Sequence, residues 1–296
     1  MSPVVTPVPV MLVEKITSRH NPLIKRFRRV RGGGERPRVF LEGPRLIEDA
    51  LGASAHFESV AFTTEFEATE RGAVLVDRLQ RVPCRGALVS KQVMEAIADT
   101  KSPQGVAAIV SRPYFELDDL FARRPDLLVI ADELQDPGNL GTIIRTAEAA
   151  GADGLITTRY TVDAFNDKAI RASMGSALRL PLVTNAERGD VVSRCRENKL
   201  RMIGSVPEMA CDELALVGKS RHDQATIYTE IDLTGPIAII VGREAAGIST
   251  EAAMQADEFA HIPMAEGVDS LNVAAAAAVL LYEAARQRGF RFNRDA

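Results

Sequence analysis

The 296-residue sequence predicts an α/β protein of two domains, the second built on a parallel sheet. Short apolar runs alternate with helical stretches, which is typical of strands covered by helices. After residue 126 these runs become nearly continuous in apolar residues, as expected for strands buried on both faces. A polar segment over residues 113–125, closed by Arg-Arg-Pro, predicts a linker between the two alternating regions.

The first domain is expected over residues 15–112. It follows a flexible leader, residues 1–14, in which prolines at positions 3, 7 and 9 argue against a helix or a signal peptide. Pro44 takes a favoured first helical position after the strand at 39–43. The other predicted elements are strands at 57–62, 86–89 and 106–110 and helices at 73–79 and 91–98.

The second domain is expected over residues 126–296. Its predicted strands lie at 127–130, 154–157, 182–184, 202–206, 237–241 and 259–262, with helices between most of them. No internal repeat or low-complexity tract interrupts this order.

Composition excludes several classes of protein. Hydrophobic residues make up 46% and charged residues 26%, an ordinary globular balance. The three cysteines and four histidines have no metal-ligand spacing, so we expect no metal, and the unpaired cysteines suit a reducing cytoplasm. The longest apolar helical run, residues 273–281, is about half of the ~20 residues that cross a bilayer. We therefore expect a soluble, cytoplasmic protein.

The net charge of −4 conceals a strongly basic segment. Residues 15–45 hold ten basic residues and two acidic ones. Such a confined positive region is typical of a surface that binds a phosphate backbone, although a charge run can also be a solvated face. The candidate RNA-binding residues are Arg19, Lys25, Arg26, Arg28, Arg29 and Arg45.

Three glycine-bearing loops follow predicted strands. The first reads Asn-Leu-Gly-Thr-Ile-Ile-Arg from Asn139 to Arg145, and the second reads Gly-Arg-Glu-Ala-Ala-Gly from Gly242 to Gly247. The third runs over residues 262–273 and leads into an alanine-rich helix. Loops of small and polar residues at strand ends expose backbone groups to a ligand, so together they outline one site.

These segments resemble the three motifs of the SpoU/TrmH family, ribose 2′-O-methyltransferases of the SPOUT superfamily that use S-adenosylmethionine on RNA. Asn139, Gly141 and Arg145 match the first motif, and Gly242, Glu244 and Gly247 match the second. The region before residue 112 is similar to the accessory RNA-binding domain of these enzymes, which resembles ribosomal proteins. Three departures affect the loops, because Arg243, Glu266 and Ala274 replace residues that are commoner in the family.

The resemblance implies a site, a topology and an assembly. The fold would be a SPOUT-type parallel sheet with a C-terminal trefoil knot, in a homodimer joined through the alanine-rich helix. Catalytic residues would be Arg145, Asn139, Ser270 and Asn272. S-adenosylmethionine would be bound by Gly242, Glu244, Gly247, Ile262, Met264, Leu271 and Asn272.

Several of these residues also have a purely structural interpretation. Arg145 could form a surface ion pair with Glu148. Ser270 and Asn272 could be helix caps, and the glycines could simply form turns. Weighing both, we expect an RNA 2′-O-methyltransferase acting on ribosomal RNA. The alternatives are a tRNA methyltransferase, a Rossmann-type nucleotide-binding protein, which would lack its usual Gly-x-Gly-x-x-Gly, or a catalytically silent RNA-binding module.

Overall fold

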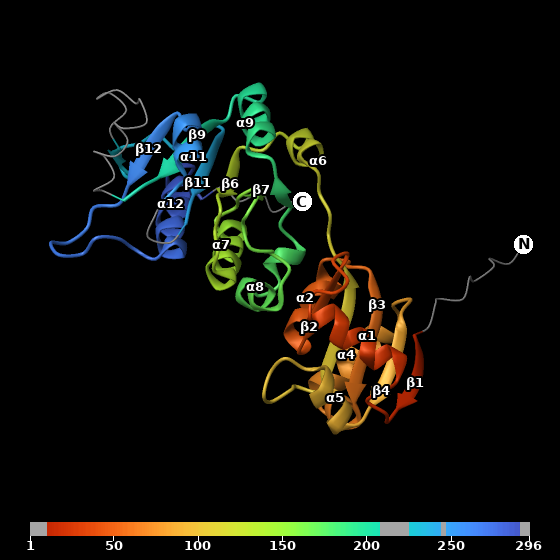
Figure 1. Ribbon diagram of the computed structural model, residues 1–296. Coiled ribbons are helices and arrows are strands. Elements are labelled where there is room, and N and C mark those ends of the chain that lie inside the picture. Colours follow the sequence, from red (N-terminus) through yellow and green to blue (C-terminus); the bar gives the residue numbers. More distant parts are fainter. Residues whose placement is uncertain (1–10, 208–224, 244–246, 291–296) are drawn as a thin grey trace, which may run out of the picture. The chain divides into compact units, whose positions relative to one another are not determined.

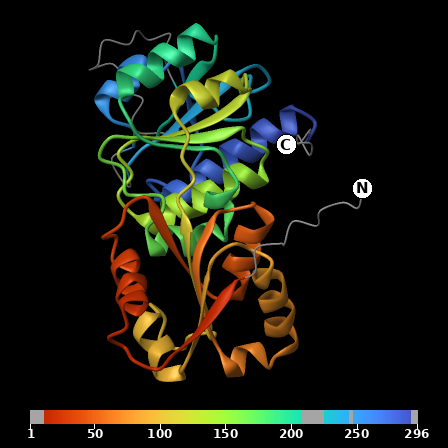
Figure 2. The same cartoon turned by 90° about the vertical axis from the view of Figure 1, so that its right-hand side faces the viewer.

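The computed structural model describes residues 11–207, 225–243 and 247–290 (Figures 1 and 2). Contacts divide them into two compact units, the first reaching Pro113 and also including Phe165–Asp167, and the second made of the other residues. The first unit is a mixed sheet with helices on its faces. Its elements are β1 (Leu12–Ile16), α1 (Pro22–Arg31), β2 (Arg38–Glu42), α2 (Pro44–Gly52), β3 (Phe57–Thr63), α3 (Thr64–Glu67), α4 (Glu70–Gln80), β4 (Arg85–Val89), α5 (Lys91–Ile97) and β5 (Val106–Ser111).

The strand order in this sheet is β1-β4-β3-β5-β2, with β5 antiparallel to both of its neighbours and the other pairs parallel. Apolar side chains of α1 and α5, among them Phe27 and Met94, pack on one face in a single buried cluster. Helix α1 begins at Pro22 because Asn21 accepts a hydrogen bond from the backbone N–H of Leu23.

The second unit carries a seven-stranded sheet. Its elements are α6 (Leu117–Ala122), β6 (Leu127–Ala131), α7 (Pro137–Ala149), β7 (Gly154–Thr158), α8 (Asp167–Ser173), η1 (Ser176–Leu178), β8 (Leu182–Ala186), α9 (Arg188–Glu197), β9 (Arg201–Ser205), β10 (Thr226–Ile227), β11 (Ile237–Val241), α11 (Thr250–Gln255), β12 (Glu258–His261) and α12 (Val273–Gln287).

All pairs in this sheet are parallel, in the order β10-β12-β9-β11-β6-β7-β8. Helices α6, α9 and α11 cover one face, where Phe121, Cys195 and Ala253 join a single apolar cluster. Helices α7 and α12 pack against each other and against β7 and β11 (Figure 1). The predicted parallel α/β architecture is confirmed, and its carboxyl strand ends all lie at one edge.

Two expected segments differ from the structure. Residues 12–14 of the expected leader belong to β1, which pairs with β4; Leu12 and Val13 are exposed, so no buried face marked them as a strand. The expected linker contains helix α6, whose Leu120 and Phe121 are buried in the second unit. A six-residue helix is too short to show a hydrophobic period.

Gly141 lets helix α8 approach α7. A Cβ atom at this position would lie 2.4 Å from the carbonyl oxygen of Ala169 and 2.7 Å from the Cβ of Ala172. This glycine of the first motif is therefore required by helix packing.

We expect Gly141→Ala to lower the free energy of unfolding by about 1–3 kcal/mol, because the helix backbones must move apart. Gly189→Ala is the matched control, since a Cβ there meets no atom within 4 Å; it should be neutral or stabilising by up to about 1 kcal/mol. Urea unfolding measures both. Equal effects of the two substitutions would contradict the packing role of Gly141.

Candidate functional site

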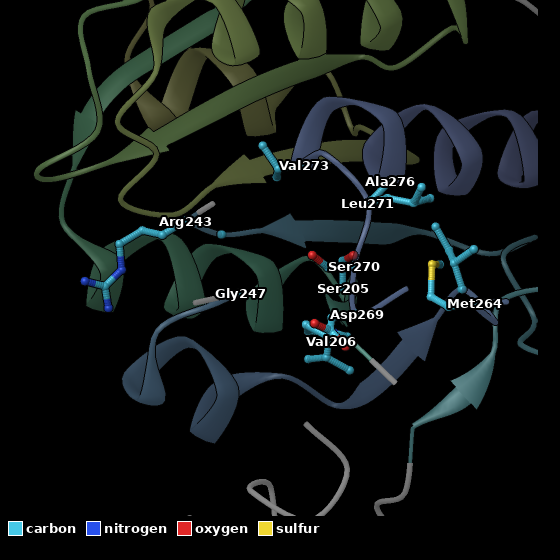
Figure 3. A pocket seen from close by; sticks show the side chains of 13 residues that line it. Ser205, Val206, Arg243, Gly247, Met264, Asp269, Ser270, Leu271, Val273 and Ala276 are labelled. Carbon is cyan, nitrogen blue, oxygen red and sulfur yellow. The ribbon is translucent and has the colours of Figure 1, made fainter. Parts of the chain in front are cut away.

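A pocket lies at the carboxyl ends of β9, β11 and β12, beside the first turn of α12 (Figure 3). Its lining residues are Ser205, Val206, Pro207, Gly242, Arg243, Gly247, Ile262, Met264, Asp269, Ser270, Leu271, Val273 and Ala276. The six expected residues in this list are Gly242, Gly247, Ile262, Met264, Ser270 and Leu271.

Backbone hydrogen bonds join Arg243 to Gly247, the described residues on either side of positions 244–246. The N–H of Arg243 donates to the carbonyl of Gly247 at 2.8 Å, and the N–H of Gly247 donates back to the Arg243 carbonyl at 3.0 Å. A Cβ atom at residue 242 would lie 2.1 Å from the Gly247 oxygen. A side chain at residue 242 would therefore clash with this backbone whether or not a ligand is bound. Glu244 lies outside the described residues.

The other pocket wall comes from the segment between β12 and α12. All four of its expected residues line the pocket: Ile262 and Met264 are half-buried, and Ser270 and Leu271 are exposed. Figure 3 shows the side chains of Met264 and Leu271 projecting from this segment. Apolar walls with a few polar groups are the usual composition of a cofactor pocket.

Asn139 of the first motif contacts Asn272 of the third. The Nδ2 of Asn272 donates to the Oδ1 of Asn139 at 3.0 Å, across 133 residues of sequence. Asn272 also caps α12 by accepting from the N–H groups of Ala274 and Ala275. Asn272 therefore has the expected capping role and a second one, and it joins two of the predicted motifs next to the pocket.

An ion pair between Asp136 and Lys168 lies at the start of α7. Asp136 caps this helix by accepting from the N–H of Asn139 at 2.8 Å, and Lys168 contacts its other oxygen at 2.6 Å. The hydrogen bond from Lys168, helped by that from Asn139, lowers the pKa of Asp136. The carboxylate thus stays charged at the positive end of the helix.

Arg145 is exposed on α7 and does not line the pocket. The suggested ion pair with Glu148 is absent from the described residues, because Glu148 binds Arg179 through two hydrogen bonds of 2.6 and 2.8 Å. Among the residues that the structure describes, no hydrogen bond or ion pair holds the Arg145 guanidinium. Its charge is accordingly available to a ligand.

Sequence reasoning missed the contribution of β9. Ser205, Val206 and Pro207 line the pocket although no motif includes them. The signal was the strand end itself, since β9 ends at the same edge as β11 and β12.

The basic segment of the first unit divides into paired and unpaired charges. Arg26 contacts Glu58 at 2.6 Å and Glu35 at 3.2 Å, and the Glu58 hydrogen bond raises the pKa of Arg26. Arg29 also contacts Glu35, and Arg45 lies 4.0 Å from Asp49. The expected residues that are exposed and form no ion pair within the described chain are Arg19, Lys25 and Arg28.

The described residues contain no group of three or more His, Cys, Asp or Glu side chains arranged to hold a metal ion. Within the same ranges, no helix is long and apolar enough to cross a bilayer.

An open parallel sheet with a glycine-bounded pocket at its carboxyl edge defines a cofactor-binding α/β protein. A model of the SpoU rRNA methylase family matches residues 126–282, and a model of an MRM3-like substrate-binding domain matches residues 21–108. The chain belongs to the SpoU rRNA methylase family.

Relatives extend this similarity along the chain. An uncharacterized tRNA/rRNA methyltransferase of Synechocystis sp. is 35% identical over 283 residues, covering 93% of this chain and 95% of its own. The 23S rRNA (guanosine(2553)-2′-O)-methyltransferase RlmP of Bacillus subtilis is 31% identical over 273 residues, which are 91% of this chain and 98% of that one.

Two solved structures of relatives contain AdoMet. The AdoMet-bound rRNA methyltransferase of Sinorhizobium meliloti has a TM-score of 0.78 and 29% identity, covering 93% of this chain and 98% of its own. The SpoU methyltransferase AviRb from Streptomyces viridochromogenes in complex with AdoMet has a TM-score of 0.77 and 26% identity, with coverages of 91% and 98%.

The two roles of Asn272 can be separated by substitution. Asn272→Ala should lower the free energy of unfolding by about 1 kcal/mol because the helix cap is lost. Asn272→Asp keeps the cap and places a negative charge at the positive helix end, so its stability should match or exceed that of the wild type. Urea unfolding measures both; an Asn272→Asp variant as unstable as Asn272→Ala would show that the Asn139 contact, and not the cap, stabilises this end.

Proposed function

We propose that this protein transfers the methyl group of S-adenosylmethionine to a ribose 2′-hydroxyl of ribosomal RNA. The observation that carries the proposal is the pocket between Gly242 and Leu271, which adjoins the Asn139–Asn272 contact. Its walls suit the cofactor, because apolar side chains can enclose the adenosine. Among the described lining residues, Asp269 and Arg243 supply one charge of each sign for a ligand that carries both.

When bound, the cofactor would supply an electrophilic methyl group; the ribose oxygen would take it in a direct displacement, with S-adenosylhomocysteine as the leaving group and the hydroxyl proton lost to solvent. The chain's own residues would then mainly hold that oxygen in line, and positioning of this kind can lower a barrier by roughly 7–11 kcal/mol. Arg145 would bind the phosphate or the developing alkoxide of the target nucleotide. It would not accept the proton, because arginine stays protonated in proteins.

Binding assays test the cofactor assignment. Isothermal titration should detect S-adenosylmethionine and not NAD, whereas NAD binding would favour the Rossmann-type alternative. Binding of neither would favour the silent RNA-binding module. Mapping 2′-O-methyl groups in ribosomal and transfer RNA after incubation with the protein distinguishes the two RNA substrates.

Further parts of the proposal concern topology and assembly. We infer a trefoil knot in the second unit, a ribosomal-protein-like fold of the first, and a homodimer formed through α12 in the cytoplasm. Exposed Tyr282 and Ala275 on α12 support the dimer, whereas Ala274 and Ala277 are buried within their own unit. Light scattering at several protein concentrations measures the assembly.

We expect Arg145→Ala to abolish methyl transfer and to leave the affinity for S-adenosylmethionine nearly unchanged, because Arg145 does not line the pocket. Arg145→Lys should recover little activity, since it removes the bidentate fork. Single-turnover assays at saturating cofactor measure the rate. Arg196→Ala, on the surface of α9, is the control, and wild-type turnover by Arg145→Ala would exclude the assigned role.

The unpaired charges of the first unit generate a separate prediction. Replacing Arg19, Lys25 and Arg28 together by alanine should flatten the log–log salt slope of RNA binding by about 2, since each phosphate contact on single strands contributes about 0.7. The corresponding variant with Arg19→Lys and Arg28→Lys keeps the charges and should keep the slope. An unchanged slope in the triple alanine variant would mean that these side chains are only a solvated face.

A further inference from the structure

A buried carboxylate lies behind the pocket wall. Asp132 follows β6 and is 1% exposed. Its Oδ1 accepts hydrogen bonds from Arg188 at 2.9 Å and from Thr158 at 3.1 Å. Burial raises the pKa of Asp132, but hydrogen bonds from Ser249 and Arg188 outweigh it and lower the pKa below its ordinary value. The carboxylate is therefore charged, and Arg188 is the cation that neutralises it.

This ion pair is connected to the loop that lines the pocket. The Oδ2 of Asp132 accepts the backbone N–H of Ser249 at 3.2 Å, two residues after Gly247. Arg188 also contacts Glu133 at 2.9 Å, and the second oxygen of Glu133 lies 3.8 Å from the Nε of Arg243. Arg243 and Ser249, which lie on either side of the undescribed residues 244–246, thus each contact a carboxylate that Arg188 binds.

Arg188 itself does not line the pocket. It stands at the first position of α9, after β8, and its side chain reaches back to residues that follow β6. Glu251, at 4.0 Å, is the remaining carboxylate paired with it in the described chain. A single guanidinium therefore joins α9, the end of β6 and the segment that begins α11.

We propose that Arg188 is a positioning residue for the cofactor pocket, which it acts on by holding Asp132 against Ser249 and Glu133 near Arg243. The ligand assignment in this inference rests on the proposed function. Without Arg188, no cation among the described residues pairs with the buried Asp132 charge. Buried charges left without a partner rearrange or take up a proton. Either change weakens the hold on the Ser249 N–H and lets the pocket wall at Gly242 and Gly247 shift.

The test compares cofactor affinity among variants of the full chain. Arg188→Ala should weaken S-adenosylmethionine binding by about tenfold or more, because the supporting contacts that hold the pocket wall in its binding geometry are lost. Arg188→Lys should recover part of the affinity, because it restores the charge but not the fork. Arg194→Ala is the matched control on the same helix, where the arginine binds Asp118 and Glu197 instead; its affinity should equal that of the wild type.

Titrations are run well below the melting temperature of each variant, so that a purely stabilising role of Arg188 would lower the melting temperature and leave the affinity unchanged. That outcome overturns the proposal. If Arg188→Ala does not fold, Glu133→Gln replaces it: a lower affinity in that variant supports the proposal, and an unchanged affinity overturns it. If the wild-type chain does not bind S-adenosylmethionine, the proposed function and this inference both fail. If the wild type binds and Arg188→Ala binds equally well, only the role of Arg188 fails.

Discussion

Parallel strand pairing is the constraint on which the candidate site depends. Because every strand of the second sheet runs in one direction, the segments after β6, β9, β11 and β12 all emerge at the same edge. Residues from distant parts of the sequence then meet without any of them being local neighbours. The order of the strands places β11 between β9 and β6, so the loop after β11 is flanked by Ser205 on one side and Asp132 on the other. Any change in this order would separate the walls of the pocket.

Much of this architecture could be predicted from local pattern. The buried strands are nearly continuous in apolar residues, so their positions could be read directly from the sequence, with ends displaced by one or two residues. Loop residues such as Gly242, Ile262 and Leu271 followed from the motifs at those strand ends. Local pattern could not predict which side chains from distant parts of the sequence form ion pairs. Nothing near Arg188 in the sequence indicates that it neutralises Asp132, which lies 56 residues earlier and is reached only through the strand order.

The basic segment illustrates the same limit for electrostatics. From the count of charges in this segment, we predicted that Arg26 and Arg29 bind RNA together with Lys25 and Arg28. The structure instead engages Arg26 with Glu58, which is 32 residues away on β3, and with Glu35. A pair that is partly buried is screened less than an exposed one, so Arg26 contributes to the packing of α1 on its sheet. Composition measures how many charges a segment holds, and only the fold determines which of them face the solvent without a partner.

The contact between Asn139 and Asn272 has a consequence for the order of folding. Its two residues are 133 positions apart, and the Asp132–Ser249 contact spans 117. Contacts with such long loops form late, because the entropy of closing the chain must be lost before they contribute. Strands β6 to β8 and their helices can therefore assemble before the pocket exists. A ligand that requires the complete pocket stabilises only the finished fold and none of its precursors, so its effect is to slow unfolding and not to guide the early steps.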